Sequence, residues 1–113
     1  MPRRRAESIA ITRGTKNVFA DLGYPDAVER QAKLRLAHAL NQVLEQRELT
    51  QTAAAAVLGL TQPKVSALQH YKLSGFSLER LMTLLTVLDQ DVEIVIKRKP
   101  RSRSVARISV VAA

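Results

Sequence analysis

The 113-residue chain contains no cysteine, no tryptophan and only four glycines. Without cysteine, it can form neither a disulfide framework nor a thiolate zinc site. The longest apolar run, residues 53–58, is far shorter than the roughly 18 residues that a membrane span needs. The basic start, Met1 to Arg5, is followed by no hydrophobic region long enough for a signal peptide. We therefore expect a soluble, cytoplasmic bacterial protein with no membrane partner.

Positive charge is abundant, and it is concentrated at the two ends. The formal net charge is +8, and such an excess favours an anionic partner, because clustered Lys and Arg displace counterions from phosphates. Residues 1–17 carry five basic groups and one acid, residues 18–92 seven and eight, and residues 93–113 six and one. Basic tails can also serve solubility alone, and this remains open for the cluster Arg3 to Arg5.

The sequence divides into three predicted regions. Gly14, Gly23 and Pro25 interrupt the start, so residues 1–25 are expected to form a basic arm. Residues 26–91 have helical periodicity, beginning with a capping box at Asp26 and Glu29. The first helix should cover about 27–47, and its inner face should consist of Ala32, Leu36, Ala37, Leu40, Val43 and Leu44.

Three further helices are predicted from their end signals. Thr50 should cap a short alanine-rich helix that ends at Gly59, and Thr61 should cap the next, with Pro63 tolerated in its first turn. After Gly75, Ser77 should cap a helix that ends near Asp89. The apolar stripe of that last helix consists of Leu78, Leu81, Met82, Leu85 and Leu88.

After Asp91 the pattern alternates, and residues 92–113 are predicted to be a β extension. Val92, Ile94 and Ile96 would share one side of a first strand, and residues 108–112 would form a second. Two strands alone are marginal in water, so they should pair with a second subunit or pack on the helices. The extension is thus a candidate dimerisation element.

The informative segment is LTQTAAAAVLGLTQPKVSAL, residues 49–68. Two short helices that cross at a wide angle need a small residue at their nearest approach (Ala55) and a turn residue free to take positive φ (Gly59). The second helix needs inner apolar anchors, here Val65 and Leu68. Its other side chains, Gln62, Lys64, Ser66, Ala67 and Gln69, are then left mainly outside, where one helix can enter a major groove.

This segment resembles the XRE-type helix-turn-helix family, built on the plan of phage repressors. The stretches NVFADLGYPDA, GFSLERLMTLLTVLDQDVEIVIK and RISVVAA resemble a subgroup of HigA-like antitoxins. The resemblance implies a mainly α, lambda-repressor-like bundle of four to five helices with a short C-terminal β-strand or hairpin. It also implies a homodimer that binds an inverted repeat in double-stranded DNA at its own promoter, near the nucleoid, and a RelE/HigB-type toxin partner.

The resemblance places a phosphate-contacting glutamine at Gln51, and positions that face bases or backbone at Gln62, Lys64 and Ser66. Glutamine can bond an adenine edge bidentately, and lysine can reach guanine or a phosphate. The predicted DNA-binding set is Gln51, Thr61, Gln62, Pro63, Lys64, Ser66, Ala67, Gln69 and Lys72.

Other interpretations of the same residues stay open at this point. A helical bundle that binds no DNA could share the spacing, and Lys72 could be an ordinary solvated lysine. An enzyme is disfavoured, because the predicted strands offer only Glu93, Lys97 and Arg107 as charged groups. His38 and His70 have no nearby ligands, so neither metal nor cofactor is expected. A solitary regulator, or a module that neutralises a partner by β-augmentation, would also fit.

Overall fold

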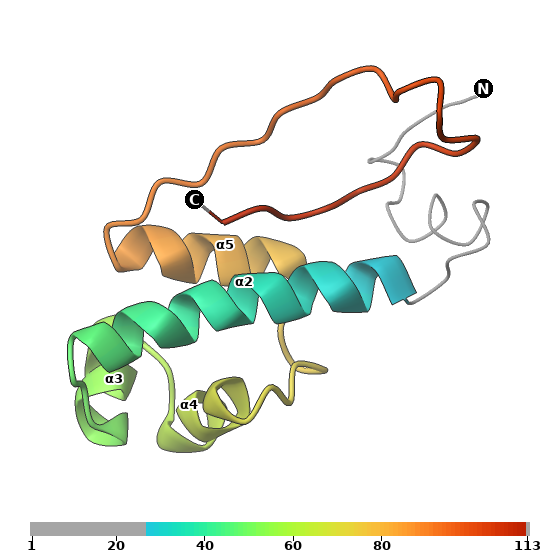
Figure 1. Cartoon of the computed structure of the whole chain (residues 1–113). Coiled ribbons are helices and arrows are strands. Elements are labelled where there is room, and N and C mark those ends of the chain that lie inside the picture. Colours follow the sequence, from blue (N-terminus) through green and yellow to red (C-terminus); the bar gives the residue numbers. More distant parts are fainter. Residues whose placement is uncertain (1–26, 113) are drawn as a thin grey trace. The chain divides into compact units, whose positions relative to one another are not determined.

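The computed structural model describes residues 27–112, and this part of the chain contains four helices (Figure 1). They are α2 (Ala27–Gln46), α3 (Gln51–Leu58), α4 (Gln62–Gln69) and α5 (Leu78–Val87). The predicted arm, residues 1–25, and the capping residue Asp26 lie outside the described residues. Among the described helices, none combines the length and apolar character that crossing a bilayer would require.

The contacts divide the described chain into two units. The larger contains Ala32–Ile96 and residues 110–112, and the smaller contains residues 27–31 and Lys97–Ser109. All of the buried core and the whole segment from α3 to α5 belong to the larger unit.

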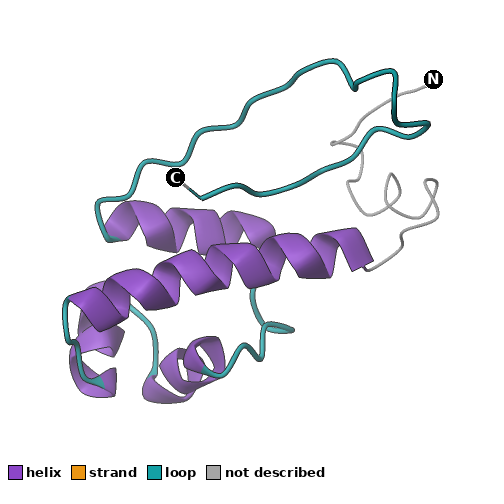
Figure 2. Cartoon of the chain, in the orientation of Figure 1, coloured by secondary structure: helices purple, strands orange, loops and turns teal. Residues whose placement is uncertain are grey.

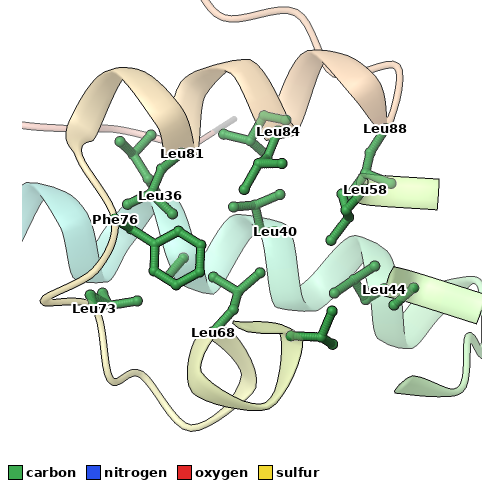
Figure 3. Close-up of a cluster of buried hydrophobic side chains, with 14 residues drawn as sticks. Leu36, Leu40, Leu44, Leu58, Leu68, Leu73, Phe76, Leu81, Leu84 and Leu88 are labelled. Atoms are coloured by element: carbon green, nitrogen blue, oxygen red, sulfur yellow. The ribbon is translucent and has the colours of Figure 1, made fainter. Parts of the chain in front are cut away.

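The larger unit is built around a leucine-rich core. Leu81 and Leu84 point from α5 toward Leu36 and Leu40 on α2, and Leu88, at the end of α5, lies beside Leu58 of α3, as Figure 3 shows. The periodic stripes predicted for the first and last helices are confirmed, with Val43, Leu78 and Met82 half-buried at the margin. Leu84, absent from the predicted stripe, is completely buried. Burying one such side chain stabilises the fold by about 1.5–3 kcal/mol.

The predicted helix starts are confirmed at three residues. The hydroxyl of Thr50 accepts from the Ala53 amide at 3.1 Å, that of Thr61 from the Lys64 amide at 3.3 Å, and that of Ser77 from the Arg80 amide at 3.0 Å. Each bond satisfies one of the amides that a helix start leaves without an intrahelical partner.

The end of α5 comes slightly before the predicted Asp89. Its last helical residue is Val87, and Asp89 takes a left-handed φ of 64°. An Arg47 guanidinium nitrogen donates to the Leu88 carbonyl at 2.8 Å and lies 3.6 Å from the Asp89 carboxylate. This arginine, directly after α2, therefore caps the C-terminus of α5.

The predicted C-terminal strands are not found, and this expectation is corrected. In the part of the chain that the structure describes, residues 92–112 form loops and turns without a strand (Figure 2). Ile94 and Ile96 are 74% and 93% exposed, so they do not cover their own helices. The physical reason is that alternation favours a strand only where a neighbouring strand supplies ladder hydrogen bonds, and a two-stranded pair is marginal alone.

One residue of the predicted second strand does contact the helices. Val110 packs half-buried against the core, and its carbonyl accepts from the Arg35 guanidinium at 3.0 Å. The final described residues are thus attached to α2 within the larger unit, whereas residues 92–96 remain exposed.

Candidate nucleic-acid interface

The turn between α3 and α4 is set by one left-handed glycine. Gly59 has φ 68°, which a residue without Cβ adopts at little cost. The Leu60 amide donates back to the Ala55 carbonyl at 3.0 Å, which closes the end of α3, and Thr61 starts α4 two residues after the turn glycine. The spacing predicts Ala55 at the nearest approach of the helices. Within α3, however, the fully buried alanine is Ala54, and Ala55 packs half-buried beside the core.

α4 is held by its predicted anchors and by one polar contact. Val65 and Leu68 are fully buried, as the motif predicts. The Asn41 amide nitrogen, on α2, donates to the Leu68 carbonyl at 3.1 Å. The inner side of α4 is therefore fixed by packing and by a directional hydrogen bond, which leaves its other side free for recognition.

The predicted DNA-binding residues fall into two groups by exposure. Ser66, Ala67 and Gln69 are half-buried, and Ala67 packs against the core. The exposed members are Gln51, Thr61, Gln62, Pro63, Lys64 and Lys72. Pro63 lies in the first turn of α4, where its missing amide hydrogen costs no intrahelical bond.

Two side-chain hydrogen bonds join the outer faces of α3 and α4. The Gln62 amide nitrogen donates to the Thr52 hydroxyl at 3.2 Å, and that of Gln51 donates to the Gln69 side-chain oxygen at 3.1 Å. The glutamines that the sequence assigns to DNA contact are therefore oriented before any ligand binds. Sequence reasoning did not identify Thr52, because a helical threonine carries no sign of the residue it will contact.

Gln62 keeps the groups that base reading needs. A glutamine amide has two N–H donors and an oxygen that accepts. One donor is used by Thr52, so one donor and the oxygen remain, and this is the pair that bonds an adenine edge in the major groove. The bond to Thr52 restricts the rotamers of the side chain without using its recognition capacity.

The residues after α4 are also held in place. Tyr71 takes a left-handed φ of 59°, and its hydroxyl lies 3.3 Å from a ring nitrogen of His38 on α2. A ring nitrogen of His70 lies 2.8 Å from the Ser66 carbonyl. Both histidines thus take part in local polar contacts. Among residues 27–112, no group of three His, Cys, Asp or Glu residues is placed to hold a metal ion.

The electrostatics of this region favour a polyanion. No Asp or Glu lies between Glu48 and Glu79, a stretch that contains α3, α4 and the loop to α5 and includes Lys64 and Lys72. A phosphate approaching α4 therefore meets cations and no carboxylate from this stretch. The absence of acids is a signal present in the sequence, and it is more local than the net charge of the chain.

A second cationic segment lies in the smaller unit. Its basic residues are Lys97, Arg98, Lys99, Arg101, Arg103 and Arg107. A turn, closed by the Arg103 amide to the Pro100 carbonyl at 3.2 Å, folds this loop, and the Lys99 ammonium donates to the Arg103 carbonyl at 2.9 Å. The loop has the composition of a phosphate-contacting element.

Two short helices held at a glycine turn, with a buried inner face and a polar outer face free of acids, define a helix-turn-helix. Residues 18–97 match the family model described as "Helix-turn-helix domain". A solved structure named "Putative XRE Family Transcriptional Regulator" is 73% identical in sequence and has a TM-score of 0.75. The match covers 79% of this chain and 100% of the chain of that structure. No curated protein matches. The chain belongs to the XRE family of helix-turn-helix proteins.

Proposed function

We propose that this protein is a sequence-specific DNA-binding transcriptional regulator that reads bases with the outer face of α4. The observation that carries the proposal is the Gln62 side chain, exposed and oriented by Thr52, with one donor and one acceptor left for a base edge. The 73% identical structure bears the name of a transcriptional regulator, which supports the same function. No catalytic step is part of this proposal.

We further propose that the protein acts as a homodimer on an inverted repeat. Ile94 and Ile96 are exposed in a segment that alternates like a strand, and unpaired apolar strands are ready templates for pairing with another chain. A second copy, related by a twofold axis, would supply the missing ladder and would present two α4 helices to two half-sites.

We also propose that the protein is the antitoxin of a toxin–antitoxin pair and represses its own promoter. This proposal rests on the stretches that resemble HigA-like antitoxins. A toxin of the RelE/HigB type would then be a second occupant of the exposed segment, through β-augmentation. The alternative is a solitary regulator of the same DNA-binding type. The exposed apolar residues of 92–96 favour a protein partner in addition to DNA.

The test of DNA binding starts from a pool of random duplexes. The full chain is incubated with the pool at moderate salt, bound duplexes are amplified through several rounds, and the recovered sequences are aligned. We expect an inverted repeat, bound at least a thousandfold more tightly than a scrambled duplex of the same length. Recovery of sequences without a common motif, or absence of binding to any duplex, would contradict the proposal.

The antitoxin setting has a separate test. The chain is co-expressed with the product of each adjacent gene, and growth and co-purification are measured. An adjacent gene product that arrests growth alone, and is neutralised by this chain in a stable complex, is the expected result. If neither neighbour is toxic, the solitary regulator is the better description, and the DNA-binding proposal is unaffected.

A further inference from the structure

The Lys64 ammonium has two intramolecular partners at the same time. It donates to the Gly75 carbonyl at 2.9 Å, and it lies 4.7 Å from the centre of the Phe76 ring. The first contact is a charge-assisted hydrogen bond, and the second is a cation–π contact. An exposed lysine side chain is ordinarily free to change rotamer, so two simultaneous partners indicate an ordered ammonium.

The partners of Lys64 are themselves fixed. Phe76 is 3% exposed and belongs to the buried core, and its amide donates to the Leu73 carbonyl at 3.0 Å. A Cβ on Gly75 would lie 2.8 Å from the Lys64 nitrogen, so the close approach of the ammonium depends on glycine at this position. Lys64 therefore ties the first turn of α4 to a loop that is anchored in the core.

We infer that Lys64 is a pre-positioned contact to a DNA phosphate, and that it does not read a base. This inference rests on the proposed function. An ammonium has three donors, of which the Gly75 carbonyl takes one, so a phosphate can be bound while both intramolecular contacts persist. On this inference, a lysine that reached a guanine edge would give up its contacts to the Gly75 carbonyl and the Phe76 ring. Because the side chain is already ordered, less rotamer entropy is lost on binding.

The experiment compares the full-length protein with the variants Lys64→Met, Lys64→Arg and Gly75→Ala. Affinity is measured over a range of salt concentrations for the selected duplex and for a scrambled one. Lys64→Met should weaken both duplexes by the same factor and flatten the slope of log affinity against log salt by about 0.9. Lys64→Arg should restore the slope, since it restores the charge.

Gly75→Ala tests the anchor without changing the charge. Its new methyl group displaces the ammonium, and we expect weaker binding to both duplexes by roughly 2- to 12-fold, the cost of ordering one long side chain. Ser74→Ala, an exposed neighbour in the same loop, is the matched control and should bind as the unmodified protein does. Wild-type affinity in Gly75→Ala would overturn the anchoring.

Two further outcomes separate this inference from the proposed function. If Lys64→Met lowers the ratio of affinities for the two duplexes by about tenfold or more, Lys64 reads a base, and the inference is overturned while the function stands. If the unmodified protein binds no duplex, the function fails and the phosphate contact is overturned with it. The anchor is measured without DNA by hydrogen exchange of the Phe76 amide, which should quicken in Lys64→Met; an unchanged rate contradicts it.

Discussion

In α3 and α4, each helix start is closed by a side chain three residues before the amide it binds, and the buried faces meet a common core. Residues 92–96 also carry large apolar side chains, but Ile94 and Ile96 are mainly exposed and no strand ladder forms in the described chain. α3 and α4 thus find their contacts within a few residues along the chain or within one core. Residues 92–96 have no such contacts in the described part of the chain.

The largest effect is expected on self-association, through Ile94 and Ile96. If a second copy covers them, changing both to Asp should weaken self-association by about 3–6 kcal/mol per subunit, since each buried isoleucine contributes about 1.5–3. Sedimentation equilibrium measures the dissociation constant. Val57→Asp, at an exposed apolar position of α3, is the control and should leave association unchanged. A double variant that dimerises as tightly as the unmodified protein removes the proposed role of the extension.

A substitution at Leu40 in the core tests how much the packed helices contribute to folding stability. Leu40 is fully buried between α2 and its neighbours, and Leu40→Ala should lower the free energy of unfolding by about 2–5 kcal/mol through lost burial and a residual cavity. Urea unfolding followed by circular dichroism gives the value. Ile96→Ala, compared at a concentration where both variants are monomeric, should change stability by less than about 0.5 kcal/mol. Equal losses of stability in Leu40→Ala and Ile96→Ala would contradict the distinction between a packed core and an exposed extension.

α4 and the basic loop of residues 97–109 should also differ in how they contribute to DNA binding. Gln62→Ala should cost about 1–3 kcal/mol at the selected site and much less on scrambled DNA, because it removes a base contact. Arg101→Gln, in the basic loop of residues 97–109, should weaken both duplexes alike and flatten the salt dependence. Fluorescence anisotropy titrations at several salt concentrations distinguish the two behaviours. Were Gln62→Ala to affect both duplexes equally, α4 would not be the reading element.

The smallest expected effect is at the caps. Thr50→Ala and Thr61→Ala each remove the acceptor for one helix-start amide, and each should cost about 1 kcal/mol of stability. Thermal unfolding at fixed protein concentration measures the loss. Ser74→Ala, a hydroxyl in the loop before α5, provides the baseline. Caps that prove neutral would mean that core packing alone determines where α3 and α4 begin.

Several features of the fold could be predicted because their causes are local. Thr50, Thr61 and Ser77 bind amides three residues away, and Gly59 supplies the positive φ of its own turn. Leucines spaced three and four residues apart mark the buried stripes of α2 and α5. These signals depend on neighbours along the chain, so a single sequence is sufficient to read them.

Other features depend on residues far apart in the sequence. Leu73 and Phe76 are buried although they lie in a loop interrupted by Gly75, because the position of that loop follows from how α4 and α5 pack. The bonds from Arg47 to Leu88 and from Asn41 to Leu68 span 41 and 27 residues. The strands predicted after Asp91 failed for the same reason, since alternation does not specify a pairing partner.

The bond from Asn41 to the Leu68 carbonyl has a consequence for redesign. If α4 rotated about its axis or slid along α2, the half-buried Asn41 amide would lose its acceptor, and an unsatisfied buried donor costs about 1–3 kcal/mol. The position of α4 on α2 is thus fixed in part by a bond between two residues outside the predicted DNA-binding set. If α4 reads bases as we propose, outer-face residues such as Gln62 could be exchanged to alter base preference while Asn41 still holds α4 on α2. The domain would then be a suitable scaffold for new operator specificities.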